Sequence, residues 1–427
     1  MPRTATLFIW FRILFNCRFY YPVYTILFLD FGLNLSQFAL LNVVWAISIV
    51  CLDLPLGALA DVIGRRRMVV VAASIMVVEM LVFACVPVGG PWVFYVLLIN
   101  RILSGAAEAF ASGADEALAY DSIPQNERAS MWPRVMGRLN RWMAVGFIVA
   151  ALIGAFVYDS AKMSWLLGTT LNKTTTLKFP IYLCVLTALG CLAVALGLRE
   201  AKHDGPVFAF GEKLRTSWRG IRHAASWIWN TPAPLLLLTL GFLLDSIVRL
   251  FYTVGSNYYR LIGIEEAWFG VISVAGSLIA LLTSSWMEWL VKHRSAKFNF
   301  LVVIAMVAWG LIVLAHPVPG WFGVALLAPI LLSMRFFQFF LSHYLNDLTD
   351  SAHRATVLSF KSLSMNLAYG TLTLLFGWQT AFLSGRLGLK NEDPQVFATA
   401  LTWWPWWFAG TMAAYSLFRM WRKPADR

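Results

Sequence analysis

Twelve long apolar segments divide this chain of 427 residues, and short polar or glycine-containing turns separate them. A helix needs about 20 residues to cross the apolar part of a bilayer, so segments of this length predict membrane-spanning helices. We place the spans at residues 7–31, 37–60, 68–87, 92–121, 131–158, 178–198, 232–259, 267–290, 298–315, 320–346, 355–383 and 396–419. The predicted fold is an all-α membrane protein with twelve transmembrane helices arranged as two six-helix bundles.

The composition supports this interpretation, because 59% of the residues are hydrophobic and only 13% are charged. Soluble domains contain about 45–50% apolar and about 25% charged residues. A soluble enzyme built from ordinary domains is therefore excluded. The first apolar segment is long enough to span and carries Arg12 and Arg18, so we interpret it as a span and not as a signal peptide.

The basic residues predict the orientation of the chain. With the N-terminus inside, 20 lysines and arginines fall in inner segments and 6 fall in outer segments. The positive-inside rule then places both termini in the cytoplasm, with the chain in the plasma or inner membrane. This placement accounts for most of the net charge of +12, so no nucleic-acid partner is needed. The tryptophans at 403, 404, 406 and 407 fit an aromatic belt at the outer interface.

The longest inner connection, residues 199–231, is basic and compatible with a helix. We interpret it as an amphipathic linker on the inner membrane surface. It separates an N-terminal six-span domain, 1–198, from a C-terminal one, 232–427. An offset of 231 residues places Arg18 over Arg249 and Gly32 over Gly263. Two copies of a six-span unit in the same orientation are a transporter architecture.

The connection between spans 2 and 3 carries the most specific motif, since residues 57–67 read GALADVIGRRR. Gly57 allows close approach of a helix, and Asp61 ends the span at the membrane face. Gly64 allows a tight turn, and the three arginines that follow hold the loop on the inner side. In span 4, residues 101–106 read RILSGA and residues 112–122 read SGADEALAYDS.

These motifs resemble those of the major facilitator superfamily, whose signature loop differs here only at Val62, where a basic residue is usual. The resemblance extends over the whole chain in architecture and is specific in spans 1–4. It implies an alternating-access transporter, in a subfamily with no assigned substrate. It also implies that Asp61, Arg65 and an acidic residue ending span 4 close the inner side. The residues of this predicted latch are Gly57, Asp61, Gly64, Arg65, Asp115, Glu116, Asp121 and Arg128; the alternative is a static surface cluster of ion pairs.

Eight basic residues lie within the predicted spans, and depth separates them into two groups. Near mid-membrane lie Arg18, Arg101, Arg249 and Arg335, whereas Arg12, Arg138, Arg141 and Lys361 lie closer to the inner face. A charge at the bilayer centre costs about 2.5–3.5 kcal/mol on insertion scales, so such residues usually face a cavity or a partner.

Arg18 and Arg249 occupy equivalent places in spans 1 and 7, and two guanidinium groups facing one site suit an anionic substrate. The alternative is internal pairing, because Asp245 precedes Arg249 by one helical turn. Further substrate-binding candidates are Tyr21, Arg101, Tyr252, Arg335 and Gln338. If the two equivalent arginines bind substrate, replacing either should abolish transport without unfolding the chain.

Asp53 in span 2 and Glu108 in span 4 are the best candidates for proton carriers, and Asp245 is a third. A moving arginine partner could switch the protonation of such a carboxylate. The alternative for Asp53 is a permanent arginine partner in a neighbouring span. Arg101, Glu108 and Asp115 are spaced by seven residues, so we expect them to lie on one face of the span 4 helix, with a slow drift around it. No partner is evident for Glu79.

The sequence therefore predicts a secondary transporter of a small molecule, an organic anion or amphiphile, with protons as candidate coupling ions. One alternative is proton-driven multidrug efflux, although span 5 lacks the proline of the drug antiporter motif. A second is a non-transporting sensor or lipid-handling protein. We expect no enzymatic activity, no cofactor and no metal, because neither the six histidines nor the five cysteines show metal-ligand spacing. The bilayer surrounds the protein, and we expect a monomer.

Overall fold

A computed structural model gives the structure of the chain. It describes residues 2–200, 210–349 and 351–422, and within these ranges the side chains at 54, 61, 213, 280, 281 and 351–355 lie outside the description. The described residues form α-helices and short 3₁₀-helices and contain no strand. The prediction of an all-α fold is confirmed.

Eight helical segments are long and apolar enough to cross a membrane, and a ninth follows if the bent pair Glu266–Ile279 and Ser284–His293 counts as one span. The three remaining predicted spans are also helical. They correspond to the broken first segment, to α18 (Ser351–Leu387) and to α19 (Pro394–Arg422). The predicted count of twelve spans is therefore consistent with the structure. The polar backbone groups of a span need internal partners, which a helix provides.

The chain forms two compact units. Unit 1 comprises residues 1–33, 44–218 and 265–274, and unit 2 comprises residues 34–43, 219–264 and 275–427. Each unit thus includes about ten residues from the other half of the sequence: the start of α3 (Leu35–Ile63) belongs to unit 2, and the start of α13 (Phe269–Leu282) belongs to unit 1.

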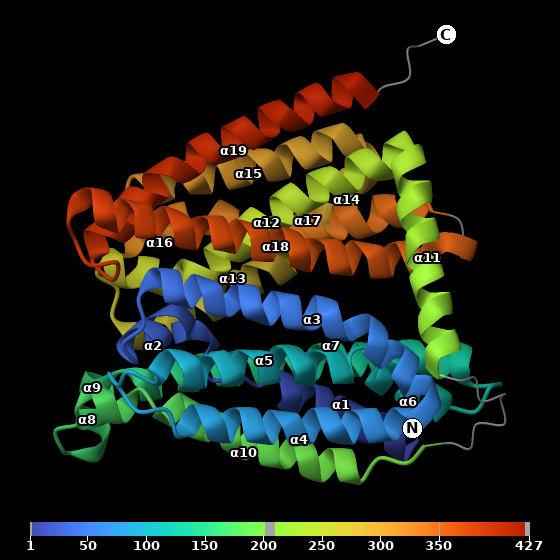
Figure 1. Cartoon of the computed structure of the whole chain (residues 1–427), viewed down its shortest axis with the longest axis horizontal. Helices are drawn as coiled ribbons and strands as arrows, with labels where there is room; N and C mark the ends of the chain where they lie inside the picture. The colour runs from blue at the N-terminus through green and yellow to red at the C-terminus, as the bar shows by residue number, and fades with distance from the viewer. Residues whose placement is uncertain (1, 201–209, 350, 423–427) are drawn as a thin grey trace. The chain divides into compact units, whose positions relative to one another are not determined.

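Unit 1 is built around a layer in which α4 packs against α5 and α10, and α1 packs against α7 and α10 (Figure 1). Its helices are α1 (Arg3–Asn16), η1 (Tyr21–Val23), α2 (Tyr24–Asp30), α4 (Arg65–Ala84), α5 (Val93–Ala111), α6 (Ala114–Asp121), α7 (Arg128–Tyr158), α8 (Ser160–Leu167), α9 (Lys173–Thr176), α10 (Phe179–Leu196) and η2 (Glu266–Trp268), with parts of α3, α11 (Phe210–Asn230) and α13.

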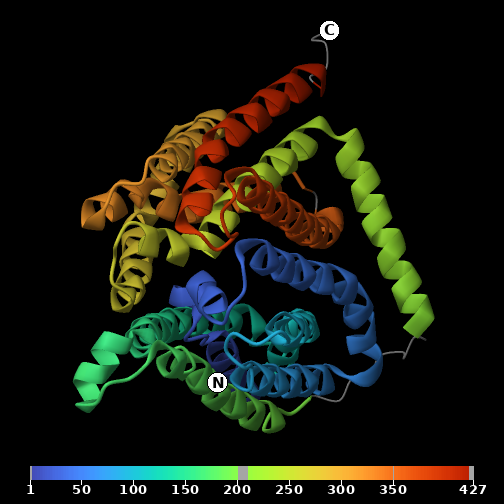
Figure 2. The ribbon, with the colours of Figure 1, turned by 60° about the vertical axis from the view of Figure 1, so that its left-hand side comes forward.

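The two ends of unit 1 are distinct. The helices α8 and α9 project beyond α7 and α10 at one end (Figures 1 and 2), and α6 lies at the other end (Figure 1). We call these the α8 side and the signature-loop side, since the turn between α3 and α4 lies next to α6. Asp159 begins α8, because its carboxylate accepts the backbone N–H groups of Ala161 and Lys162.

In unit 2, α12 packs against α17 and α18, and α15 packs against α17 and α19. Its helices are α12 (Pro232–Leu261), α14 (Ser284–His293), α15 (Ala296–Ala315), α16 (Gly320–Leu326), α17 (Ala328–Asp347), α18 and α19, with parts of α3, α11 (Phe210–Asn230) and α13. The end of α11 joins this unit through Ile228, which packs with Leu235, Leu238, Leu345 and Val357.

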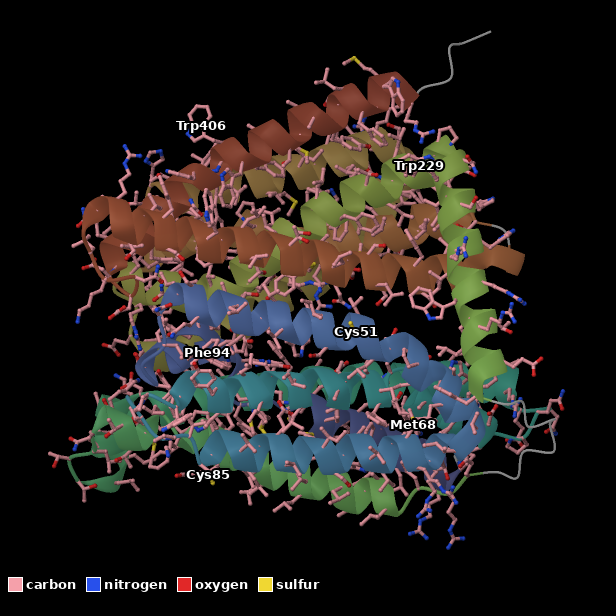
Figure 3. All side chains as sticks on the ribbon, in the orientation of Figure 1. Cys51, Met68, Cys85, Phe94, Trp229 and Trp406 are labelled. Atoms are coloured by element: carbon pink, nitrogen blue, oxygen red, sulfur yellow. The ribbon has the colours of Figure 1, made fainter. Side chains whose placement is uncertain are left out.

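The tryptophans of the last span differ in their surroundings. Trp406 is 78% exposed and points outward from α19 (Figure 3), as an interfacial residue would. Trp404 is fully buried and packs edge-on against Phe376 at 5.7 Å between ring centroids. The predicted aromatic belt therefore does not include Trp404, because this face of α19 lies against α18.

Candidate functional site

The first span is interrupted between Asn16 and Tyr21, where the chain leaves the helical conformation before Pro22 starts a new turn. Side chains of neighbouring helices satisfy the backbone groups that this break exposes. Phe19 N–H donates to the Cys184 sulfur at 3.2 Å, and the Thr187 hydroxyl donates to the Cys17 carbonyl at 3.4 Å. Irregular backbone at membrane depth is tolerated only where protein or a cavity satisfies it.

Gly154 of α7 makes this break possible. A Cβ atom at Gly154 would overlap the carbonyl of Phe19 and would lie 3.0 Å from its Cα. Only glycine lets α7 approach the interrupted backbone this closely.

The break places Arg18 in the core of unit 1. Its Nη1 lies 3.1 Å from Oε2 of Glu79, and the two side chains are 5% and 0% exposed. Glu79, to which the sequence assigned no partner, is thus the counter-charge of Arg18. A buried pair of this kind is strongly destabilised when one partner is removed.

Arg101 is also buried, at 4% exposure, but forms no ion pair in the part of the chain that the structure describes. Its guanidinium lies over the rings of Tyr24 and Phe28, each at 5.6 Å from the centroid. Its Nε and Nη1 atoms have no hydrogen-bond partner among these residues. Glu79 pairs with Arg18 and not with Arg101, so the Arg101 guanidinium is buried without a counter-charge in direct contact, and an anion would supply one.

The two proton-carrier candidates of unit 1 are partly accessible. Asp53 and Glu108 are both half-buried, and neither forms an ion pair with a described residue. The permanent arginine partner considered for Asp53 is therefore absent from the described residues. Tyr21, a substrate-binding candidate, is 51% exposed.

In unit 2, Arg249 is paired as the alternative interpretation predicted. Its Nη2 lies 2.7 Å from Oδ2 of Asp245, one turn earlier on α12. Its Nη1 donates to Asn366 of α18 at 2.8 Å, and Gln338 of α17 donates to the other oxygen of Asp245 at 3.3 Å. Asp245 is fully buried, whereas the side chain of Arg249 remains 27% exposed. Three helices of unit 2, α12, α17 and α18, thus contribute side chains to one polar cluster.

Two further cations of unit 2 form no ion pair among the described residues. Arg335 on α17 is exposed, and Lys361 on α18 is half-buried within electrostatic range of Asp245. Tyr252, which is 45% exposed, donates its hydroxyl to the Leu331 carbonyl. Unit 2 therefore presents more positive than negative charge at this level.

On the signature-loop side, Gly64 adopts φ +97°, and this accounts for the tight turn expected from the motif. Arg65 pairs with Asp121, and Nη2 of Arg128 lies 3.6 Å from the same carboxylate. The sequence had placed Asp121 within reach of both arginines. Unexpectedly, Glu200 accepts the backbone N–H groups of Arg65 and Arg66 at 2.8 and 3.3 Å and so caps α4.

Other members of the predicted latch lie elsewhere. Asp115 is 1% exposed and pairs with Arg12, at 2.5 Å from its Nε, and not with the arginines of the loop. Glu116 is exposed. No described heavy atom lies within 4 Å of a Cβ built on Gly57, so no helix approaches closely there. The side chain of Asp61 lies outside the described residues.

The predicted continuous face of span 4 is wrong, because α5 ends at Ala111 and α6 begins at Ala114. Between them Gly113 adopts φ +71°, a conformation that favours glycine. The break places Asp115 on a separate helix beside Arg12 of α1, and Glu108 remains within electrostatic range of both.

A cluster on the α8 side was not anticipated. Lys173 pairs with Glu266, lies 4.0 Å from Asp30 and donates to the Tyr158 carbonyl at 3.1 Å. Nearby, Lys162 lies 2.9 Å from Glu265, and this hydrogen bond raises the pKa of the exposed lysine. The sequence does contain a signal for this cluster, because the loop after span 5 carries lysines and the loop before span 8 carries acidic residues.

Interrupted spans that carry paired charges at mid-depth are characteristic of secondary transporters. The sequence profile of the Major Facilitator Superfamily matches residues 6–372. The chain belongs to this superfamily, and it is a multi-pass membrane transporter, not an enzyme.

Solved structures show the same fold. A variant of the nucleoside transporter NupG is 15% identical, has a TM-score of 0.72, and 99% of each chain is covered. A bacterial homologue of the human lysosomal transporter Spinster, in an inward-facing and unoccupied conformation, is 15% identical with a TM-score of 0.68, covering 98% of this chain and 95% of that one. A D-xylose–proton symporter is 15% identical with a TM-score of 0.64, covering 95% and 96%. No curated protein matches the sequence.

Proposed function

We propose that this transporter moves a small organic anion by alternating access, with protons as the coupling ion. The observation that carries the anion concerns two arginines at membrane depth. Arg101 in unit 1 and Arg335 in unit 2 have no ion pair among the described residues, although charges in spans usually find a partner or a ligand.

The proposal assigns different roles to the two equivalent arginines. Arg18 neutralises Glu79 inside unit 1 and is 5% exposed, so it supports the fold beside the binding site. Arg249 is partly exposed and sits with Gln338 and Asn366, so it contacts the substrate. Tyr21 and Tyr252, both about half exposed, supply hydroxyl groups and aromatic faces.

Proton coupling is supported by Asp53 and Glu108. Both are half-buried carboxylates on α3 and α5 without a described ion pair, so a proton can neutralise them at modest cost. Asp245 is the corresponding group of unit 2, but its bond to Arg249 must break before it binds a proton. Movement of Arg249 toward a substrate anion would release it, which would link substrate binding to protonation.

The test measures thermal stabilisation of the purified protein by succinate, glycerol 3-phosphate, benzoate and tetraphenylphosphonium. A ligand at one hundred times its Kd adds about 2.7 kcal/mol to the folded state. We expect an anion to raise the melting temperature of the parent and of Arg386→Gln, an exposed arginine at the end of α18, but not of Arg335→Gln. Flux of the same anion into proteoliposomes should then depend on an imposed pH gradient.

Stabilisation by tetraphenylphosphonium, retained in Arg335→Gln and lost in Glu108→Gln, would instead favour proton-driven export of cationic compounds. Stabilisation by an anion with no flux in either direction would favour the non-transporting sensor.

The same proposal includes the topology: two six-span halves, 1–198 and 232–427, joined by α11 on the cytoplasmic membrane surface. The support is the distribution of 20 inner and 6 outer basic residues. Cys85, exposed at the end of α4 on the α8 side, is a natural reporter (Figure 3). A membrane-impermeant maleimide should label it in intact cells, and Cys85→Ser should remove the signal.

A further inference from the structure

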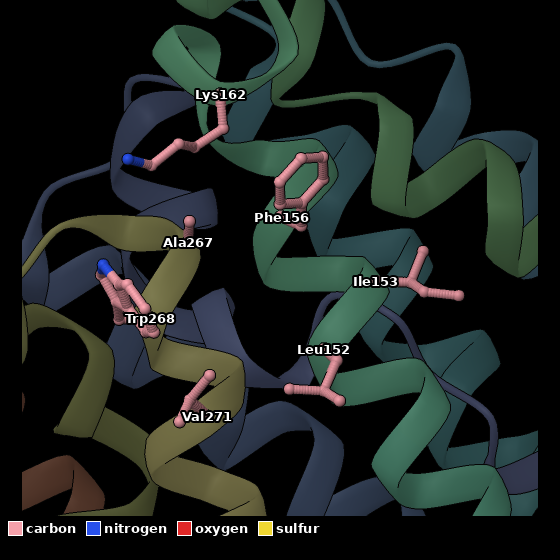
Figure 4. Close-up of a pocket in the computed structure, with 7 residues that line it drawn as sticks. All are labelled: Leu152, Ile153, Phe156, Lys162, Ala267, Trp268 and Val271. Atoms are coloured by element: carbon pink, nitrogen blue, oxygen red, sulfur yellow. The ribbon is translucent and has the colours of Figure 1, made fainter. Parts of the chain in front are cut away.

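An apolar groove of about 410 Å³ lies on the α8 side of unit 1 (Figure 4). One wall is the end of α7, with Leu152, Ile153 and Phe156, and the other is η2 and the start of α13, with Ala267, Trp268 and Val271. Lys162 of α8 is the single charged residue among those that line it. The volume falls within the range of about 300–1,000 Å³ that small-molecule sites occupy.

We propose that this groove binds one phospholipid with a phosphoethanolamine head group, whose acyl chain fills the groove and whose head group contacts Lys162 and Glu265. This inference does not depend on the transported substrate. It depends on the geometry of the groove, on the charges at its mouth and on the bilayer that surrounds the chain.

The walls of the groove are fixed to each other. Asp159 caps α8 with one carboxylate oxygen and accepts the backbone N–H of Ala267 at 3.2 Å with the other. Below the groove, a Cβ atom on Gly270 would lie 3.0 Å from the Cα of Leu152, so α13 and α7 approach with no side chain between them. The groove therefore stays open without a ligand, because its two walls cannot close further.

The position of the groove matches the depth of an acyl chain. Leu152 lies six residues before the end of α7, or about 9 Å below it at about 1.5 Å per residue. The mouth lies beside α8, where Trp165 is 78% exposed, as expected of an aromatic side chain at the level of the head groups. The apolar part thus lies within the acyl region, and the charged pair lies at its edge.

The mouth carries one charge of each sign. Lys162 and Glu265 lie 2.9 Å apart, and their side chains are 38% and 60% exposed. A phosphate can accept from the lysine while a primary ammonium donates to the glutamate, so a zwitterion satisfies both groups. A purely anionic head group would meet the negative charge of Glu265, and a choline head group has no N–H to donate to it.

The test uses the full-length protein, purified in detergent and depleted of lipid, and counts bound phosphatidylethanolamine by native mass spectrometry. Val271→Trp fills the groove, and we expect it to lower the apparent affinity for the first lipid at least tenfold. The matched control is Val145→Trp, an exposed valine of α7 outside the groove, which should bind as the parent does. Melting temperatures of both variants report folding.

Two head-group variants separate a specific site from general lipid coverage. Lys162→Gln and Glu265→Gln should each weaken binding of phosphatidylethanolamine, whereas Lys390→Gln, an exposed lysine in another connection, should not. Equal binding of phosphatidylglycerol or phosphatidylcholine by the parent would overturn the proposal. So would unchanged binding by a folded Val271→Trp variant.

Discussion

The first and seventh spans, which the internal repeat predicts to be equivalent, differ at the position of their arginine. In unit 1 the helix breaks at residues 17–20 and directs Arg18 into the core, where Glu79 of α4 neutralises it. In unit 2, α12 continues without a break for 30 residues, and Arg249 pairs with Asp245 of the same helix while remaining partly exposed. A local change in backbone thus separates a buried arginine that holds helices together from one that remains partly exposed.

The pairs also differ in how they can be rearranged. Arg18 and Glu79 lie on different elements and are nearly inaccessible, so separating them requires the packing of unit 1 to change. Arg249 has Asn366 as a second partner and is partly exposed, so it can move away from Asp245 at lower cost. Unit 1 thus holds an ion pair that is difficult to separate, and unit 2 holds one that can rearrange.

The largest effect is expected from Glu79→Gln, which leaves the Arg18 guanidinium buried without a counter-charge. Removing one partner of a buried ion pair costs about 3–5 kcal/mol. The matched variant Asp245→Asn should lose less than half as much, because Arg249 keeps Asn366 and its exposure. Chemical or thermal unfolding of both proteins in detergent measures the difference, and equal losses would remove the distinction between the two pairs.

The next largest effect is expected from Gly154→Ala. The added methyl group would collide with the carbonyl of Phe19 at the break, and overpacking of this kind costs about 1–3 kcal/mol. In unit 2, Gly241→Ala of the unbroken α12 provides the control. There a Cβ meets only the flexible ends of Leu341, at 3.3 Å, and Met365, at 3.6 Å, so the melting temperature should change little. A stable Gly154→Ala protein would show that the break is not held by this contact.

A smaller effect is expected from Asp121→Asn, which weakens the bonds to Arg65 and Arg128 on the signature-loop side. These side chains are about 30% exposed, and pairs of this kind contribute about 0–1 kcal/mol to stability. If the cluster closes one side of the transporter, accessibility of neighbouring cysteines introduced on α6 should rise in this variant although its melting temperature hardly changes. Unchanged accessibility would support a static surface cluster.

The smallest effect concerns the exposed pair of Lys162 and Glu265. The pKa of Lys162 is raised by its hydrogen bond to Glu265, so the folded state holds this proton more tightly than the unfolded state does. The resulting stability is present below the unfolded pKa, about 10.4 for lysine, and is lost as the pH rises through the folded value. The melting temperatures of the parent and of Glu265→Gln should therefore differ slightly at pH 8 and coincide near pH 12. A difference that grows with pH would contradict this.

The fold was predictable because apolar length alone determines where helices can span, and all twelve segments contain helices. The i,i+4 pair of Asp245 and Arg249 was also predictable, since its geometry is set within one helix. The pairs of Arg18 with Glu79 and of Arg12 with Asp115 were not. Their partners are 61 and 103 residues apart, and the choice depends on which helices are neighbours and on breaks at residues 17–20 and 112–113. The periodicity of apolar residues indicates neither which helices are neighbours nor where a helix breaks.

The composition of the two units has a consequence for synthesis of the chain. Unit 1 contains residues 265–274, which follow the linker and the whole of α12. At about 5–20 residues per second, a ribosome adds this segment several seconds after the rest of the unit is complete. Until then, the end of α7 and the carboxylate of Asp159 lack their native neighbours. Unit 1 therefore lacks part of its native packing until residues 265–274 have been synthesised. A chain cut within the linker would regain this packing only when both fragments are present in the same membrane.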